Sequence, residues 1–184
     1  ARQCIFYDDG RMIRASFGEL GLYDQEGQEI WKLKVPRHHA LNRRRNGHLL
    51  FPVSVNTELN GQSVRGDEIW EVDLDGKILR RQGLMEFLPE VVRRLGLSEI
   101  PTADATWLPD PNASHVEVTH VNTVTEIGPN KLGESNPIFA EGNILVNLHE
   151  PIGALIVLSS DFKRLLWVSQ VQRRSHSAFM LPNG

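Results

Sequence analysis

The stretch His39-Ala-Leu-Asn-Arg-Arg-Arg-Asn-Gly-His-Leu-Leu-Phe51 places a histidine seven residues before an Asn-Gly turn and an apolar run directly after that turn. The same spacing returns at the end of the sequence, where His176 lies seven residues before Asn183-Gly184. A related copy begins at His120 and reaches Gly142-Asn143-Ile-Leu-Val146 after a longer excursion. Recurring strand–turn–strand units indicate a repeat fold. A histidine at the same place in each unit predicts a ring of imidazoles around one site.

A second recurring unit consists of a strand, an acidic turn and another strand, and it occupies residues 20–31, 68–79 and 154–167. The Asp-x-x-Gly and Asp-Gly turns in the first two of these segments supply the positive φ angles that tight hairpins need. Joining the two kinds of unit gives four strands in succession. Four-stranded antiparallel sheets repeated along a chain are the blades of a β-propeller.

This phasing predicts an all-β fold of propeller type, with about three blades that form a partial domain over residues 1–184. The expected blades are a partial one at 4–35, complete ones at 38–83 and 118–171, and the start of another at 174–184. Between the complete blades, residues 84–117 form an expected insertion. Its first part predicts a short amphipathic helix, because apolar residues recur there at helical spacing. A Pro/Asp-rich loop at 101–112 follows, and a second loop is expected at 128–140.

Composition limits the classes of function. Apolar residues make up 40% of the 184 residues and the formal net charge is -3, so no general field attracts nucleic acid. No run approaches the roughly 18 apolar residues of a membrane span. The single cysteine, Cys4, excludes an internal disulfide and a multi-cysteine zinc site. The first residues lack a signal-peptide core, which leaves the compartment open and is compatible with a secreted or periplasmic protein whose leader has been removed.

Three segments in the same order resemble the arylsulfotransferase family: residues 66–79, Thr119-His-Val-Asn-Thr123 and His176-Ser-Ala-Phe-Met-Leu-Pro-Asn-Gly184. The resemblance extends from about residue 60 to the end. It implies a six-bladed propeller that transfers a sulfuryl group from a phenolic sulfate ester to a phenol, without a nucleotide sulfate donor. His120 and His176 match active-site histidines of the family.

The sequence also departs from the family pattern. Ser177 stands where an aspartate is common, and His149 stands near a place where arginine often appears. The histidine that becomes sulfated in the family lies in a later blade than those present here.

Imidazole chemistry suits this reaction, because a histidine can act as nucleophile, as acid or base near neutral pH, and as donor to sulfate oxygens. His120 and His176 are therefore the predicted catalytic residues. Asn122 follows His120 by two residues and shares its face of the strand. Asn122 and His39 are predicted to bind the substrate, a small phenolic sulfate or phenol. Metal binding by the recurring histidines stays open as an alternative, but their spacing does not require it, and no cofactor motif is present.

Each of these features also has a purely structural interpretation. His120 and His176 could bond a neighbouring blade, and this role is favoured for His38 and His39. The other histidines (His48, His115 and His149) are expected to be ordinary strand or loop residues. The run at 43–45 is expected to be solvated, with an anion clamp as the alternative, and Trp31, Trp70 and Trp167 are expected to pack between blades.

The alternative function is a non-catalytic propeller that serves as a scaffold or interaction subunit. In either case about three blades cannot close a ring. The ring is expected to be completed by a segment outside this sequence, by a partner subunit, or by a second copy.

Overall fold

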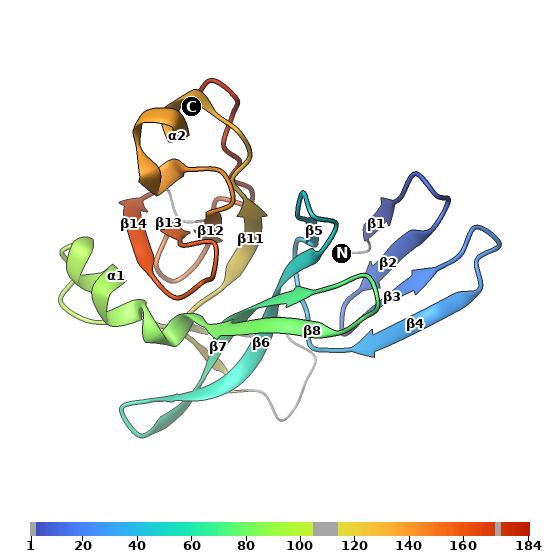
Figure 1. Cartoon of the computed structure of the whole chain (residues 1–184). Helices are drawn as coiled ribbons and strands as arrows, with labels where there is room; N and C mark the ends of the chain where they lie inside the picture. Colours follow the sequence, from blue (N-terminus) through green and yellow to red (C-terminus); the bar gives the residue numbers. More distant parts are fainter. Residues whose placement is uncertain (1–2, 105–113, 172–173) are drawn as a thin grey trace.

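The computed structural model describes residues 3–104, 114–171 and 174–184. Three antiparallel sheets built on four strands each follow one another along the described chain (Figure 1). We refer to them as sheets A, B and C. Together they define an all-β chain of propeller type, as the repeats predict. In Figure 1, the blue strands of sheet A and the orange and red strands of sheet C lie on opposite sides of sheet B.

Sheet A contains β1 (Gln3–Phe6), β2 (Met12–Ser16), β3 (Glu19–Tyr23) and β4 (Glu29–Lys34), paired in sequence order. The sequence predicts the outer strands of a blade here, with an N-terminal hairpin, and the structure has all four strands. Its buried side chains, among them Ile13 and Leu22, contribute to a core that sheet A shares with sheet B.

Sheet B contains β5 (Asn42–Arg43), β6 (Leu49–Leu59), β7 (Gln62–Val72) and β8 (Ile78–Gly83). Strands β6 and β7 pair over eleven residues, which is longer than β8 can cover. The uncovered end of β7 pairs at Arg65 with the short parallel strand β10 (Val116–Glu117), and β10 pairs with β9 (Ala103–Asp104). The insertion between the blades therefore returns to the sheet just before the segment that contains His120.

Sheet C contains β11 (Val121–Glu126), β12 (Ile144–Leu148), β13 (Ala154–Leu158) and β14 (Leu165–Gln170). Strand β12 is buried along its whole length. One side of sheet C shares a core with sheet B and with the helical insertion, and the other side packs against the chain end through Ala178 and Met180.

The predicted amphipathic helix is confirmed as the helical turn η1 (Leu84–Glu86) and α1 (Leu88–Arg94). The apolar side chains that suggested it are buried against sheets B and C: Leu84, Phe87, Leu88, Val91 and Val92. The helix begins with a proline at its first turn, where a missing N–H costs nothing.

The segment at 128–140, expected to be a loop, contains the short helix α2 (Lys131–Ser135) and the helical turn η2 (Pro137–Phe139). The Asn130 side chain caps α2 by accepting a hydrogen bond from the backbone N–H of Gly133 at 2.7 Å. Helical spacing could not reveal this element, because a single turn has no buried stripe.

The first strands of the three sheets are neighbours. The Asn42 side chain at the start of β5 donates to the Val124 carbonyl of β11 at 2.9 Å. The Gln3 side chain of β1 accepts from the Leu41 backbone N–H at 2.7 Å. β1, β5 and β11 are therefore the inner strands, as in the blades of a propeller.

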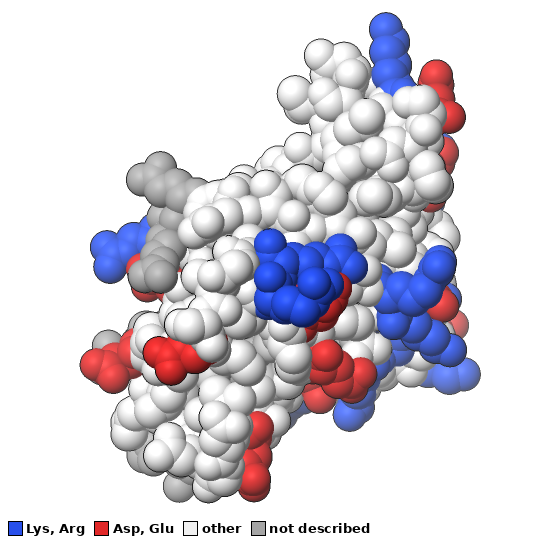
Figure 2. Space-filling view, turned by 90° about the vertical axis from the view of Figure 1, so that its left-hand side faces the viewer, with Lys and Arg blue, Asp and Glu red and all other residues white. Residues whose placement is uncertain are grey.

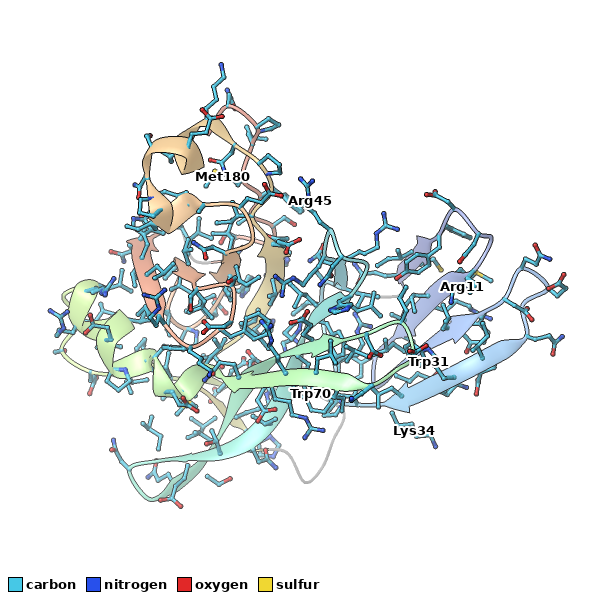
Figure 3. The ribbon with its side chains drawn as sticks, in the orientation of Figure 1. Arg11, Trp31, Lys34, Arg45, Trp70 and Met180 are labelled. Carbon is cyan, nitrogen blue, oxygen red and sulfur yellow. The ribbon has the colours of Figure 1, made fainter. Side chains whose placement is uncertain are left out.

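Tryptophan packing between sheets is seen at Trp31, whose indole N–H on β4 donates to the Leu74 carbonyl of sheet B at 2.8 Å. Figure 3 shows Trp31 beside the turn that precedes β8. Trp70 lies on β7, the third strand of its sheet, where its ring packs against Phe51 within the core shared by sheets A and B.

Charged side chains of both signs are mixed on the face drawn in Figure 2. Basic side chains lie there beside acidic ones, and much of the surface has neither. Among the described helices, none combines the length and the apolar character needed to cross a membrane. Most of the predicted Pro/Asp-rich loop, residues 105–112, lies outside the described residues.

Candidate functional site: a cluster of five histidines

Five of the seven histidines meet where the inner strands begin. They form a continuous series of ring contacts, which we call the histidine cluster: His38, His39, His120, His149 and His176. Ring centroids are 5.1 Å apart for His38 and His39, and 4.6 Å for His39 and His120. The series continues through His149, 5.0 Å from His120 and 5.0 Å from His176. His38 is buried, and His176 is exposed, so the cluster leads from the interior to the surface.

The segment that leads into β5 supplies the first two rings. His39 has a left-handed backbone with φ of 50°, which is uncommon for a residue other than glycine. The buried Arg37 guanidinium donates to the His39 carbonyl at 2.6 Å, and the Ala40 backbone N–H donates to the Asn122 carbonyl at 3.2 Å. The unusual conformation is thus held by neighbours, as is typical of residues whose side-chain direction matters.

A buried carboxylate orients His38. Its Nε2 lies 2.7 Å from Asp67 Oδ1, and the other Asp67 oxygen accepts the Val121 backbone N–H at 2.8 Å. Because a carboxylate only accepts hydrogen bonds, the His38 proton lies on Nε2 and the lone pair lies on Nδ1.

A second carboxylate orients His120. Glu117 lies 3.1 Å from His120 Nδ1 and 2.7 Å from the Arg65 guanidinium. Burial opposes ionisation of Glu117, but the hydrogen bonds from His120 and Arg65 outweigh it and hold the pKa of this carboxyl below its usual value. His120 therefore donates from Nδ1, and its Nε2 faces Nε2 of His39.

At the exposed end, Asn122 orients His176. The Asn122 amide nitrogen lies 3.3 Å from His176 Nδ1 and also donates to the Ser175 carbonyl at 3.0 Å. Since an amide NH₂ can only donate, His176 Nδ1 is the acceptor and the neutral ring has its proton on Nε2. Buried Asn147 holds the same Ser175 carbonyl at 3.1 Å, which fixes the segment that presents His176.

His149 connects the two ends. Its backbone N–H donates to the His120 carbonyl at 2.7 Å. Burial, followed by the neighbouring His120 and His176, lowers the pKa of His149. Burial, followed by His38 and His120, also lowers the pKa of His39, to about 3. Both rings are therefore neutral at physiological pH.

The residues predicted from the sequence are close together: His39 contacts His120, and Asn122 contacts His176. Two members of the cluster were missed, since His38 and His149 were expected to be structural or ordinary. The one sequence feature noted for His149 was that it stands near a place where arginine often appears in the pattern that the chain resembles. Nothing in the sequence pointed to Asp67, which contacts His38 from β7, or to Glu117, which the pairing of β10 with β7 brings beside Arg65.

The remaining candidates lie apart from the cluster. His48 contacts the Glu71 carboxylate at 2.8 Å, and His115 is exposed. Arg43 and Arg45 are exposed as predicted, but Arg44 is buried, which the sequence did not predict. A surface hollow of about 330 Å³ lies on sheet A, and none of the clustered histidines lines it.

Comparison with known proteins yields structural similarity only. No protein-family model matches the chain. No curated protein is similar to it. A protein of unknown function from Bacteroides caccae superposes with a TM-score of 0.46 and 14% identity, over 93% of this chain and 47% of that one. The β-propeller domain of Cps50 (Swd1) from Myceliophteria thermophila superposes with a TM-score of 0.37 and 9% identity, over 94% of this chain and 56% of that one.

The chain thus spans about half the length of these structures. The fold assignment stands on the three sheets themselves, and the arylsulfotransferase resemblance stands on the sequence motifs alone.

Proposed function

We propose that the histidine cluster is the centre of an aryl sulfotransferase-like site, which moves a sulfuryl group from a phenolic sulfate ester to a phenol. The observation that supports this best is the hydrogen bond between Asn122 and His176. It links the two motifs that resemble the arylsulfotransferase family, although 54 positions separate these residues in the sequence.

Of the two predicted catalytic histidines, one presents a hydrogen-bond donor and the other presents an acceptor. His176 presents an N–H at the exposed end, because Asn122 donates to its Nδ1. That N–H suits a sulfate oxygen or the oxygen of the departing phenolate. His120 presents a lone pair at the inner end, because Glu117 accepts from its Nδ1. That lone pair suits activation of the acceptor phenol.

The reaction balances without a redox partner. The bond between sulfur and the donor's aryl oxygen breaks, and a bond between sulfur and the acceptor's oxygen forms, directly or through a sulfated histidine. The acceptor phenol loses its proton at the His120 end, and the departing phenolate gains one at the His176 end. His149 lies between the two rings and can return the proton. Further blades, supplied by another segment or a partner subunit, would complete the ring around this site.

The test is an assay of sulfuryl transfer from 4-nitrophenyl sulfate to phenol, followed as release of 4-nitrophenolate that depends on the acceptor. We expect His120→Asn and His176→Asn each to lower the rate by about 10²–10⁴-fold, the usual contribution of a positioned acid or base. His115→Asn is the matched control, because His115 is exposed and outside the cluster. It should keep the wild-type rate.

Absence of transfer in the wild-type protein would refute the proposal, as would full activity in both His120→Asn and His176→Asn. Under either outcome the scaffold function would become the better explanation of the fold.

A further inference from the structure

We propose that His38, His39 and His120 bind one divalent transition-metal ion, with zinc as the expected occupant. One ring nitrogen from each of these residues lies within 4.8 Å of the others. His38 and His120 are buried, and His39 is partly buried. Three imidazoles converging from two separate segments of the chain match the ligand set of a catalytic zinc site, in which a fourth position stays open.

In the neutral rings, the hydrogen bonds to Asp67 and Glu117 determine which nitrogens can bind a metal ion. Asp67 fixes the proton of His38 on Nε2 and leaves Nδ1 as the ligand atom. Glu117 fixes the proton of His120 on Nδ1 and leaves Nε2. A carboxylate that accepts from the far nitrogen of a histidine ligand is the usual support of a zinc site, and it also raises the basicity of the ligand. Here two of the three ligands have such a support.

A shared cation would account for the contact between His39 and His120. Their Nε2 atoms face each other, although the His120 nitrogen already bears a lone pair. Either His39 places its one proton between the two rings, or a cation does so for both. The left-handed backbone of His39, held by Arg37, aims this ring at the other two.

The geometry needs only a modest adjustment. Zinc–nitrogen bonds of about 2.0–2.1 Å in a tetrahedron place the ligand nitrogens roughly 3.3 Å apart. The most widely separated nitrogens, which lie up to 4.8 Å apart, would therefore close in by up to about 1.5 Å, and the nitrogens of His39 and His120 would separate. Imidazole ligands accept zinc, cobalt, nickel and copper, and the site excludes magnesium and calcium, which prefer oxygen.

A metal ion would also supply positive charge at the inner end of the proposed site, where a sulfate ester needs it. This step rests on the proposed function. Lone pairs repel the oxygens of a sulfate ester. A cation among them attracts those oxygens, and a phenol that binds it through its oxygen loses its proton more readily. His120 would then activate the acceptor through the metal ion rather than directly.

The test measures metal binding on the metal-free protein, with no reference to activity. We expect calorimetry to show one equivalent of Zn²⁺ per chain. Co²⁺ should give the intense visible absorption of a tetrahedral site with nitrogen ligands. His39→Asn and His120→Asn should each weaken Zn²⁺ binding by at least 100-fold. Asparagine tolerates the left-handed backbone, so His39→Asn is expected to fold.

Two further variants separate this site from nonspecific binding. Asp67→Asn keeps all three ligands but removes the carboxylate that supports His38, and it should weaken binding by about 10–100-fold. His149→Asn removes a ring that contacts His120 but is not a proposed ligand, and it should leave the stoichiometry and the Co²⁺ spectrum unchanged. Absence of binding in the wild type, or equal binding in His39→Asn, His120→Asn and His149→Asn, would overturn the inference.

Failure here is distinguishable from failure of the proposed function. Sulfuryl transfer by a protein that binds no metal would reject the metal site and leave the transfer function standing. Stoichiometric metal binding in a protein without transfer activity would reject the transfer function and leave the metal site standing.

Discussion

The buried Arg44 guanidinium joins sheets B and C through two ion pairs. Its guanidinium contacts Glu71 of β7 at 3.1 Å and Glu126 of β11 at 2.8 Å, and the Arg44 side chain is only 8% exposed. It therefore links sheets B and C next to the strand that follows the His39 segment. Its neighbour Arg45 contacts Glu141 at the surface, where the two side chains are 61% and 50% exposed.

We expect Arg44→Met to lower the free energy of unfolding by about 3 kcal/mol, because Glu71 and Glu126 lose the cation that they share. The loss is limited because Glu71 keeps its contacts with His48 and Arg80. Arg45→Met removes an exposed pair and should change that free energy by about 0.5 kcal/mol or less. Urea unfolding of the two variants measures the difference. Equal losses would show that Arg44 does not hold the sheets together.

The sequence was least informative about which individual polar residues are buried and which residues they contact. Arg43, Arg44 and Arg45 are chemically alike, so no local pattern distinguishes the buried one. Its burial follows from Glu71 and Glu126, whose proximity depends on how two sheets pack. The same holds for His38, whose partner Asp67 lies 29 positions away in the sequence.

At the scale of elements, the acidic turns are the best-predicted features. Gly27 and Gly76 end equivalent Asp-x-x-Gly turns with φ of 80° and 79°, and in both turns the aspartate side chain accepts backbone N–H groups. The third copy of the turn has Phe162 at the corresponding place, with φ of 69°. A sequence rule based on glycine cannot find that turn, because burial of the phenyl ring compensates for the backbone conformation there.

The two glycine turns give a matched pair of substitutions. Gly27→Ala should destabilise the protein by about 1–2 kcal/mol, the cost of a left-handed backbone, because open space surrounds the new Cβ. Gly76→Ala should cost more, since its Cβ would lie 2.9 Å from the Trp31 ring that joins sheets A and B. Thermal or urea unfolding would measure both. A smaller loss for Gly76→Ala than for Gly27→Ala would contradict this description of the interface.

Helical elements were predicted where they are long enough to bury a stripe of side chains. That condition holds for α1, with Leu88 and Val91 buried, and fails for α2, none of whose residues is buried. The parallel pairing of β7 with β10 was also beyond prediction, because it joins residues 52 positions apart through a single pair. Yet this pairing brings Glu117 to Arg65, and thereby orients His120.

At the scale of the whole molecule, the repeat pattern predicted the succession of four-stranded sheets. It also predicted that histidines from separate units meet, because equivalent positions of successive blades face a common axis. The two shared cores explain why the sheets hold this arrangement: one lies between sheets A and B, and the other joins sheets B and C with α1. The hydrogen-bond partners that determine the tautomers of the rings could be identified only from the three-dimensional structure.

The central claim is that the histidine cluster is one site with an accepting inner end and a donating outer end. A crystal structure of the protein with benzylsulfonate tests it most directly, because a methylene there replaces the bridging oxygen of phenyl sulfate and prevents transfer. We expect the sulfonate at the exposed end of the cluster, with one oxygen within hydrogen-bond distance of His176 Nε2 and the Asn122–His176 contact intact. Sulfonate bound away from both rings, or the two histidines found on separate surfaces, would contradict the claim.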